Sequence, residues 1–577
     1  MLNKRVLGAL VALGIVLAAC GGGGTSNSPG ASGNASPTFT PAKDQTFRFG
    51  ATEPPTLDPQ KATDSASIVV LRSITRPLVY FDADLKVVTD GGLAQKYDVS
   101  ADGKTVTFTL KSGIKYSNGD PIKASDFVYS FQRLIDPRTA AGYSYVMGDI
   151  VGAADLLALD PTKLPADAKL DEMIAKLGVE APDDSTFVVH LANPTAYFPY
   201  IVSLWVTAPV EKAWIAAKDA TEAKNYVGSG PFSLTQWEHN AKLVLKPNAN
   251  WTGAKPKLAE IDMTLYSDTN LTYDAYQNDE LDMTSVPSAN RTQVTADPEL
   301  SKEVIKSSVL ATYYIGFDMR GSGEGKPVSL VGKSKELRYA FSESVDRAAL
   351  VNTVNQGVGT PATSMVPKGM QGNQPDIGLK YDVTKAKADL ATALTALGVT
   401  AADLSDGGKN AIELGFNSGA GHEPIMEFLQ AQWQTNLGIK VKLSGLEWKS
   451  FLARLDEQPF TMYRLGWGAD YPHPNNFLRD VFGCTGNTAN GNNEARWCNA
   501  QFNDLLNQAA TKPDIASALP LYNQAQQILV DDAPVIFLYW YGRFTLVKPW
   551  VQGLTPTAQD STTGELFFDR IRIAAHS

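Results

Sequence analysis

From residue 45 onward, segments with the period of a β-strand alternate along the chain with segments that have the period of a helix. Residues 104–110 (KTVTFTL) alternate apolar side chains with threonines, as a half-buried strand does. Residues 124–135 follow a polar turn and repeat apolar side chains at helical spacing. Near the other end, residues 424–437 predict a helix and residues 439–443 a strand. This alternation predicts an α/β fold.

The ends of these elements carry the expected stop signals. Gly438 directly follows the helix predicted at residues 424–437, where a left-handed residue commonly ends a helix. Further strands are predicted at residues 186–191, 242–246 and 535–540, and further helices at residues 337–353 and 514–531. We find no internal repeat.

The N-terminal residues have the pattern of an export signal. Lys4 and Arg5 precede a short apolar run that ends in small residues before Cys20, and this run is too short for a permanent membrane span. The tetrapeptide LAAC, which ends at Cys20, resembles a bacterial lipobox. The resemblance implies a signal peptide at residues 1–19 and a lipid on Cys20 that anchors the protein to the outer face of the cell membrane.

The next segment is predicted to be a tether. Residues 20–43 are rich in Gly, Ser, Asn and Pro and have almost nothing to bury. Beyond them no apolar run is long enough to span a bilayer, so we expect membrane contact through the lipid anchor only. The net charge of −10 argues against nucleic acid as a partner.

Two further cysteines occur, Cys484 and Cys498, on either side of a loop rich in Gly, Asn and Thr. An even pair in an exported protein is most simply a disulfide. Zinc is a poorer explanation, because no second cysteine pair or nearby histidine pair completes a site. We expect no metal site and no cofactor.

The sequence offers little for catalysis. It holds five histidines and lacks the HExxH, GxSxG and CxxC patterns. The acidic pairs at residues 183–184 and 531–532 stand at a turn and at a helix end, where solvated caps explain them better than acid–base chemistry. The sequence therefore indicates a protein that is not an enzyme.

Long ordered segments resemble the bacterial extracellular solute-binding proteins of the peptide and nickel ABC importers. The resemblance rests on segments at residues 92–103, 105–131, 228–234, 281–283, 337–347, 436–443, 447–448 and 546–550. It covers nearly everything from about residue 45 to the end, and within the family it is greatest to the oligopeptide-binding proteins.

The resemblance implies a periplasmic-binding-protein-like α/β fold of two lobes joined by a hinge, with an inserted extra domain. The implied boundaries are lobe I at residues 44–75, 228–310 and 543–577, the inserted domain at residues 76–227, and lobe II at residues 311–542.

The resemblance also assigns binding roles, and most of them fall in the stretch RLGWGADYPHP, residues 464–474. It implies that Asp470 receives the α-ammonium of a bound peptide and that Arg464 meets the carboxylate of a short one. It makes Trp467 a pocket residue, His422 a second carboxylate contact for a longer peptide, and Tyr143 an aromatic lining residue from the inserted domain.

These assignments are chemically reasonable. A carboxylate in a closing cleft is completed by an ammonium, and a planar guanidinium suits a carboxylate. Alternatives remain at this point: Arg464 pairing structurally with Asp470 or another acid, His422 as a satisfied residue at a helix start, and Trp467 as core. The chain also departs from the oligopeptide binders, since Asn355 stands where they carry a lysine and Gly468 where they carry a cysteine.

The implied function is that of a substrate-binding lipoprotein, monomeric, which captures short peptides between closing lobes and delivers them to an ABC permease and its ATPase subunits. The alternatives are a receptor of the same fold for a nickel chelate, a sugar or an amino-acid conjugate, a peptide-sensing surface lipoprotein, and a secreted hydrolase.

Overall fold

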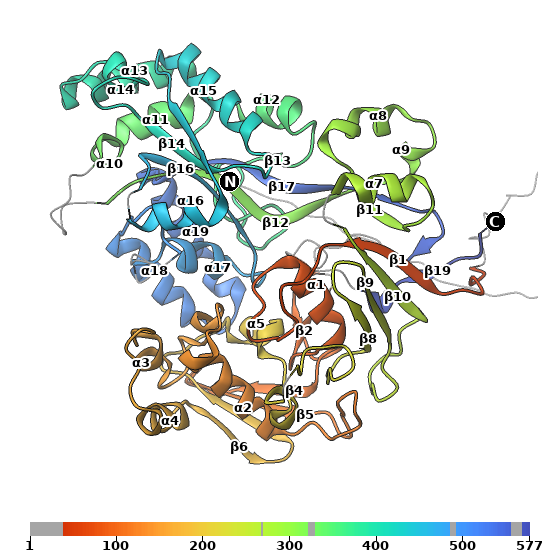
Figure 1. Cartoon of the computed structure of the whole chain (residues 1–577). Helices are drawn as coiled ribbons and strands as arrows, with labels where there is room; N and C mark the ends of the chain where they lie inside the picture. The colour runs from red at the N-terminus through yellow and green to blue at the C-terminus, as the bar shows by residue number, and fades with distance from the viewer. Residues whose placement is uncertain are drawn as a thin grey trace, which may run out of the picture. The chain divides into compact units, whose positions relative to one another are not determined.

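The computed structural model (Figure 1) describes residues 39–82, 84–217, 219–266, 269–320, 329–457, 459–484, 492–554 and 568–576. The predicted signal peptide, Cys20 and nearly all of the predicted tether lie outside these residues. Residues 41–577 make up one compact unit. Over the described ranges, no helix is both long enough and apolar enough to cross a membrane.

The largest element is a mixed sheet. Within the described residues it has 11 strands, ten in one hydrogen-bonded order and β13 (Thr360–Pro361) paired with β17 beside it. The order is β15 (Lys442–Leu446), β14 (Glu413–Asn417), β16 (Met462–Gly468), β12 (Val304–Phe317), β17 (Val535–Val547), β11 (Met283–Ser285), β1 (Thr46–Ala51), β10 (Glu260–Leu265), β9 (Lys242–Pro247) and β8 (Phe232–Glu238).

Two long strands hold the two halves of this sheet together. β12 has 14 residues and β17 has 13, against the usual five or six, and they pair antiparallel along their lengths. The register between them shifts between Ser308 and Thr312. Gly542 lies opposite Ser308, and a Cβ at Gly542 would come within 2.7 Å of the backbone nitrogen of Gly359. The midpoint of the pair is therefore irregular and requires glycine.

A second sheet lies within residues 76–227. It consists of β4 (Ala94–Val99), β5 (Thr105–Leu110), β7 (Thr186–His190) and β6 (Val179–Asp183), all antiparallel. Helix α2 (Ala124–Ile135) packs on it through Phe131, whose ring meets that of Phe187 edge-on at 5.0 Å. Burying each such phenylalanine contributes roughly 1.5–3 kcal/mol. Two small sheets complete the set: β2 (Tyr80–Phe81) with β3 (Val87–Val88), and β18 (Val551–Gln552) with β19 (Arg572–Ile573).

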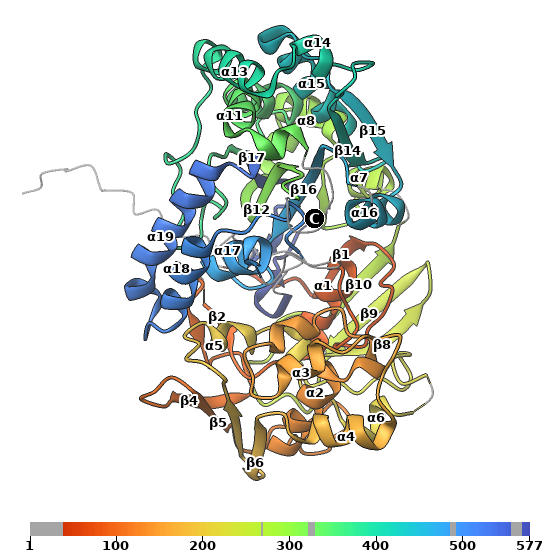
Figure 2. The ribbon, with the colours of Figure 1, turned by 90° about the vertical axis from the view of Figure 1, so that its left-hand side faces the viewer.

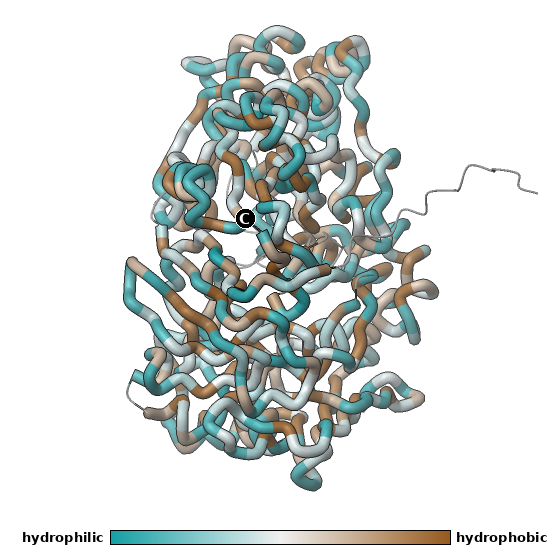
Figure 3. The backbone as a smooth tube through the Cα atoms, turned by 90° about the vertical axis from the view of Figure 1, so that its right-hand side faces the viewer, coloured by the Kyte–Doolittle hydropathy of each residue, from teal (hydrophilic) through white to brown (hydrophobic). Residues whose placement is uncertain are grey.

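Helices lie against these sheets, while β8 and β9 stand at the outer edge in Figure 1 and β4, β5 and β6 reach the outside in Figure 2. Hydrophilic and hydrophobic residues alternate along the backbone in Figure 3. The other helices before β12 are α1 (Ser65–Ile74), α3 (Ala153–Leu157), α4 (Asp167–Ala175), α5 (Phe198–Ile201), α6 (Lys212–Ile215), α7 (Thr269–Gln277), α8 (Arg291–Ala296) and α9 (Leu300–Glu303). Those after it are α10 (Leu330–Lys333), α11 (Lys335–Glu343), α12 (Arg347–Ala349), α13 (Val383–Leu397), α14 (Ala401–Leu404), α15 (Glu423–Leu437), α16 (Trp448–Glu457), α17 (Pro474–Phe482), α18 (Ala500–Ala510) and α19 (Ile515–Asp532).

The α/β prediction is confirmed, and α2 has the predicted bounds. Three predicted elements are wrong in detail. The strand expected at residues 535–540 continues to Val547 as β17. The single helix expected at residues 337–353 is broken after α11, because Asp346 accepts a hydrogen bond from the Ala349 N–H and begins a new helix. The strand expected at residues 439–443 begins three residues later, as β15, because Ile439 and Val441 are buried in the core as the chain enters the sheet.

The predicted disulfide is present between Cys484 and Cys498. Because it closes a short loop, it restricts the unfolded chain and stabilises the fold by about 3 kcal/mol. We expect the Cys484→Ser/Cys498→Ser double variant to unfold at a lower urea concentration, by an amount equivalent to about 3 kcal/mol, with the slope of the transition nearly unchanged. Equal midpoints for the variant and the oxidised parent would contradict this.

Candidate functional site

The two charges of the stretch RLGWGADYPHP are placed by β16 and by the turn that follows it. β16 pairs with β12, so that Arg464 lies opposite Ile315 and Gly466 opposite Tyr313. Side chains two residues apart in a strand point to the same face, so Arg464 and Gly466 share one face of β16. Asp470 lies two residues beyond the end of the strand.

Neutral groups hold the carboxylate of Asp470. Its Oδ1 accepts a hydrogen bond from the hydroxyl of Tyr143 at 2.8 Å, and its Oδ2 accepts one from the hydroxyl of Tyr145 at 2.9 Å. The Nδ2 of Asn476 donates a third, also at 2.9 Å, to Oδ2. Asp470 thus joins residues from the segment that carries the second sheet to the start of α17, and no described hydrogen bond brings it a cation.

Asn476 organises this corner. Its side chain is fully buried, and its Oδ1 accepts hydrogen bonds from the Asp470 N–H at 2.9 Å and from the Trp467 Nε1–H at 3.1 Å. Its amide nitrogen donates to Asp470 and, at 3.0 Å, to Asp480. His473 begins α17 by accepting the Asn475 N–H through Nδ1. The helix start therefore fixes Asp470 and Trp467 with a single amide.

The two carboxylates near Asn476 lie where burial disfavours their ionised forms. Burial raises the pKa of Asp470 although its three hydrogen bonds oppose this. Burial also raises the pKa of Asp480 to about 6, and the nearby Arg479 only partly offsets it. The guanidinium of Arg479 is bonded to Asp149 instead, at 3.0 Å. An added cation beside Asp470 is therefore favoured electrostatically.

Arg464 is a buried cation whose described side-chain hydrogen bonds go to neutral acceptors. Its Nη1 donates to the Oδ1 of Asn417 at 3.1 Å, its Nη2 to the hydroxyl of Tyr541 at 2.9 Å, and its guanidinium lies 4.5 Å from the ring centre of Tyr313. Its Nε is buried, and no described residue accepts a hydrogen bond from it. The structural pairing with Asp470 that the sequence left open is therefore not the observed arrangement.

Gly466 makes room for this arrangement. A Cβ at this position would lie 2.9 Å from the hydroxyl oxygen of Tyr541, the same oxygen that accepts from Arg464. A side chain on the strand between Arg464 and the turn would push Tyr541 away. This explains one glycine of the stretch by close approach.

His422 belongs to the Arg464 cluster. It directly precedes α15, and its Nδ1 lies 3.2 Å from the hydroxyl of Tyr313. Burial first, and then the charge of Arg464, lower its pKa to about 4. His422 is therefore neutral near pH 7 and can offer a hydrogen bond but not a charge.

A cavity of about 230 Å³ opens beside Asp470. It is lined from three parts of the chain: by Thr63, Ser65 and Ile68, by Tyr143 and Trp205, and by residues 467–470. Trp467 both packs against a buried core cluster and lines this cavity, so it is a core residue and a pocket residue at once. The structure thus brings Asp470, Trp467 and Tyr143 to one cavity, with Arg464 and His422 in a separate cluster farther back along β16.

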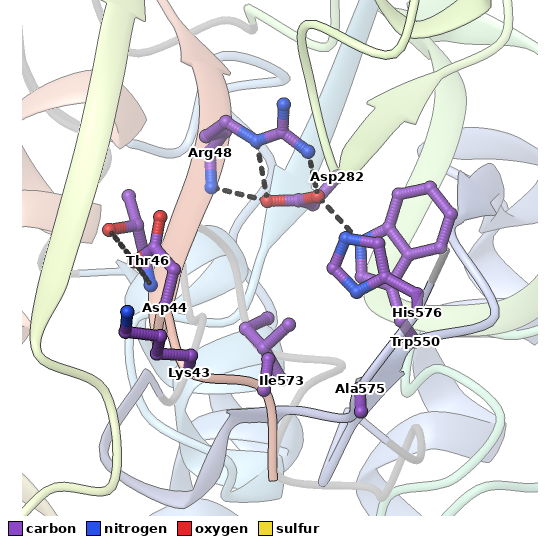
Figure 4. A pocket seen from close by; sticks show the side chains of 10 residues that line it. Lys43, Asp44, Thr46, Arg48, Asp282, Trp550, Ile573, Ala575 and His576 are labelled. Carbon is purple, nitrogen blue, oxygen red and sulfur yellow. Dashed lines mark hydrogen bonds and ion pairs between the residues drawn. The ribbon is translucent and has the colours of Figure 1, made fainter.

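A larger cavity of about 400 Å³ has a different chemistry (Figure 4). Its buried carboxylate, Asp282, is bonded to the guanidinium of Arg48 at 2.8 Å and to Trp550 Nε1 at 2.8 Å, and His576 stacks on Trp550. Because Asp282 already has a cation in Arg48, we interpret the contacts around this cavity as structural contacts near the two ends of the described chain. Among the described residues no group of three or more His, Cys, Asp and Glu side chains could hold a metal ion.

Several site residues were not predicted. Tyr145, Asn476, Asn417, Tyr541 and Tyr313 all contact a predicted residue. Only two had a local signal: Asn476 follows the Pro of a helix start, and Tyr145 lies two residues from Tyr143. The other three come from distant strands.

Three comparisons place the chain among known proteins. Residues 89–489 match the family model of the bacterial extracellular solute-binding proteins, family 5. The chain is 33% identical over 554 residues to the oligopeptide-binding protein OppA of Bacillus subtilis, covering 93% of each chain. It is 30% identical to the periplasmic oligopeptide-binding protein OppA of Salmonella typhimurium, covering 89% of this chain and 90% of that one.

A solved structure agrees in fold. The murein tripeptide binding protein MppA of Escherichia coli superposes with a TM-score of 0.74 at 26% identity, over 93% of this chain and 100% of that one. The periplasmic-binding-protein-like fold predicted from the sequence is thereby confirmed.

The buried His473 gives the site a testable pH dependence. Burial lowers its pKa to about 3, so below pH 6.5 the unfolded chain takes up a proton that the folded chain does not. This group therefore removes about 2 kcal/mol of stability between pH 7 and pH 5. His473→Asn keeps an acceptor for the helix start, and we expect its free energy of unfolding to fall by about 2 kcal/mol less over the same interval.

Urea unfolding of both proteins at the two pH values measures this difference. The carboxylates are common to both proteins, so their contribution cancels in the comparison. The same loss of stability in parent and variant would show that His473 does not stay neutral.

Proposed function

The chain belongs to the bacterial extracellular solute-binding proteins of family 5, and on that premise we propose that it captures short peptides for an ABC importer. One observation carries the proposal: Asp470 faces a cavity lined from three parts of the chain, and its described partners are all neutral. A half-buried carboxylate without a described counter-ion favours a ligand that brings a cation. The names of relatives that bind oligopeptides support the peptide as that ligand.

In this proposal the two ends of a peptide are recognised separately. Asp470 binds the α-ammonium, and Arg464 binds the carboxylate through the guanidinium that no described carboxylate neutralises. A charge-assisted hydrogen bond contributes roughly 1.5–3 kcal/mol net. Trp467 and Tyr143 form walls of the cavity beside the ammonium.

The strand limits the length of such a ligand. A strand rises about 3.3 Å per residue, so the six residues from Arg464 to Asp470 span at most about 20 Å. The Cα atoms of the two residues are therefore at most about 20 Å apart, a separation that suits short peptides whose free ends meet both side chains. His422 is proposed as a second contact for the longer of these, and since its imidazole is neutral it would donate a hydrogen bond to the carboxylate.

Closure needs a hinge, and we propose the midpoint of β12 and β17. The register shift after Ser308 and the close approach of Gly542 to Gly359 make this the irregular point of the two long strands. The proposed lobes are residues 44–75, 228–310 and 543–577 on one side and residues 311–542 on the other, with residues 76–227 as the inserted domain. A ligand that touches both sides then favours the closed form.

The remaining parts of the proposal rest on the sequence and the family. We propose that the protein is not an enzyme, that it is monomeric, and that it passes its ligand to a permease and ATPase subunits. We also propose that lipid on Cys20 holds it at the outer face of the cell membrane. A mass shift on the N-terminal peptide, absent in Cys20→Ser, would test the anchor.

The binding proposal predicts that a variant at either charged residue loses affinity only for peptides whose corresponding end is free. We expect Asp470→Asn to weaken binding of a free tripeptide by at least about tenfold, because the charge-assisted bond to the ammonium is lost. The same variant should not further weaken an N-acetylated tripeptide, which already lacks the charge. Arg464→Gln should discriminate in the same way between a free and an amidated C-terminus. Titration calorimetry of the chain from residue 21 measures all of these affinities.

The control is Asp44→Asn, an exposed carboxylate that lines the other cavity and should bind as the parent does. Thermal unfolding of each variant separates loss of binding from loss of fold. Unchanged affinity in a folded Asp470→Asn would rule out the ammonium site and direct the search to non-peptide solutes.

A further inference from the structure

A third cavity, of about 180 Å³, lies beside the irregular midpoint of β12 and β17. Three segments line it: residues 306–308 of β12, residues 357–360, which lead into β13, and residues 541–543 of β17. The hinge was proposed at this midpoint, so the cavity is lined from both proposed lobes. A ligand in it would contact the chain on either side of the hinge.

The lining of this cavity carries positive charge and no carboxylate. Lys306 and Arg543 are its two basic residues, and no Asp or Glu is among the lining residues. The acidic residue nearest to Lys306 in the sequence, Glu303, accepts a hydrogen bond from the hydroxyl of Tyr276 at 2.6 Å. In a chain with a net charge of −10, a cavity with two basic side chains and no acidic one favours an anion.

Several polar groups of the lining have no described protein partner. The hydroxyls of Ser307, Ser308 and Thr360 form no hydrogen bond with a described residue. The ammonium of Lys306 forms no described ion pair, and its described contact is with the ring of Phe544, whose centre lies 5.2 Å away. Hydroxyls and an ammonium are the donors that an oxyanion accepts from. A lone exposed lysine is ordinarily only hydrated, but here three hydroxyls and a second basic residue line the same cavity.

Glycines keep this cavity open. Gly357 and Gly359 have positive φ angles, of 74° and 97°, which favour glycine. At Gly542 a Cβ would come within 2.7 Å of the backbone nitrogen of Gly359. The three positions therefore lack side chains where the segments approach each other, and a small ligand can reach the backbone between them.

We propose that this cavity binds an oxyanion, the carboxylate or phosphate group of a ligand, at the hinge. Lys306 and Arg543 supply the positive charge. The hydroxyls of Ser307, Ser308 and Thr360 supply hydrogen bonds. Because residues on both sides of the hinge hold the anion, its binding is coupled to the arrangement of the proposed lobes.

Two sources can bring such a group to the hinge. Tyr541 lines the cavity and accepts a hydrogen bond from Arg464 at 2.9 Å, so the cavity adjoins the residue proposed for the ligand's carboxylate. An acidic side chain near the C-terminal end of a bound peptide is therefore one source, and this part of the inference rests on the proposed function. A free phosphate ion is the other. The cavity admits either, since one water needs only about 10–15 Å³ of such volume.

Inorganic phosphate tests the site directly. Calorimetric titration of the chain from residue 21, which keeps the compact unit of residues 41–577, measures its affinity for the parent and the variants. We expect Lys306→Gln to weaken phosphate binding by at least about fivefold, because a charge-assisted hydrogen bond is lost. Lys306→Arg keeps the charge and should bind within about twofold of the parent. The matched control is Lys302→Gln, which removes an exposed lysine that is paired with Glu299 and does not line the cavity.

Tripeptides that differ in one side chain identify the source of the anion. Ala-Ala-Glu is compared with Ala-Ala-Gln in the parent and in Lys306→Gln, and Glu-Ala-Ala with Gln-Ala-Ala as the control pair. If the peptide supplies the anion, the parent binds Ala-Ala-Glu at least about fivefold more tightly than Ala-Ala-Gln, and both the variant and added phosphate abolish this preference. The ratio within the control pair should not depend on Lys306. If free phosphate is the ligand, Ala-Ala-Glu and Ala-Ala-Gln bind alike and phosphate binds in the presence of either.

The inference is overturned if neither phosphate binding nor the preference for Ala-Ala-Glu depends on Lys306, or if Lys302→Gln weakens phosphate binding as much as Lys306→Gln does. Phosphate binding requires no peptide, so its dependence on Lys306 is measurable even if the proposed function fails. Tripeptides that bind without any dependence on Lys306 would in turn leave the proposed function standing. Lys306 is exposed, so its variants should fold, and circular dichroism with thermal unfolding checks this.

Discussion

No described cation is bonded to the carboxylate of Asp470, and the surrounding structure follows from this constraint. Moving an ionised carboxylate out of water is costly unless hydrogen bonds satisfy it. Here three come from neutral groups on two different parts of the chain, Tyr143 and Tyr145 on one side and Asn476 on the other. The turn after β16, the start of α17 and the tyrosine pair must therefore all be in place for the site to exist. Their hydrogen bonds keep the acid ionisable while leaving its charge uncompensated.

Arg464, the opposite charge, is also held by neutral hydrogen-bond partners and so stays apart from Asp470. Arg464 also has neutral partners, Asn417 and Tyr541, and Gly466 lets Tyr541 approach. A direct ion pair between Arg464 and Asp470 would neutralise both charges and leave nothing for a zwitterion. Because each charge is anchored locally by dipoles, the strand can hold them apart. The local hydrogen bonds of each side chain thus keep the two charges of the stretch from pairing with each other.

Local elements were predictable, and long-range contacts were not. Residues 124–135 form a helix with the expected bounds because apolar spacing and the residues at its start agree. The disulfide followed from an even pair of cysteines in one loop. The helix at residues 337–353 failed because Asp346 is an equally good helix start, and periodicity does not report such a break. The resemblance indicated Asp470 and Arg464, but their supports Asn417, Tyr541 and Tyr313 come from strands distant in the sequence, so no local pattern could identify them.

The hydrogen bonds to Asp470 also bear on how a ligand could change the protein. Tyr143 and Tyr145 lie in the proposed inserted domain and Asp470 in the proposed second lobe, so these bonds already join two of the moving parts. A ligand shifts an equilibrium only by its difference in affinity between the two states. The tyrosine hydroxyls supply hydrogen bonds to the carboxylate but do not compensate its charge. The difference in the ligand's affinity between the two states must therefore come from charge compensation. A cationic amino end compensates the charge of Asp470 whatever side chain follows that amino end. Because the hydrogen bonds of the carboxylate are nearly complete without a ligand, charge compensation is what remains for the ligand to provide, and the protein then recognises the ends of the ligand.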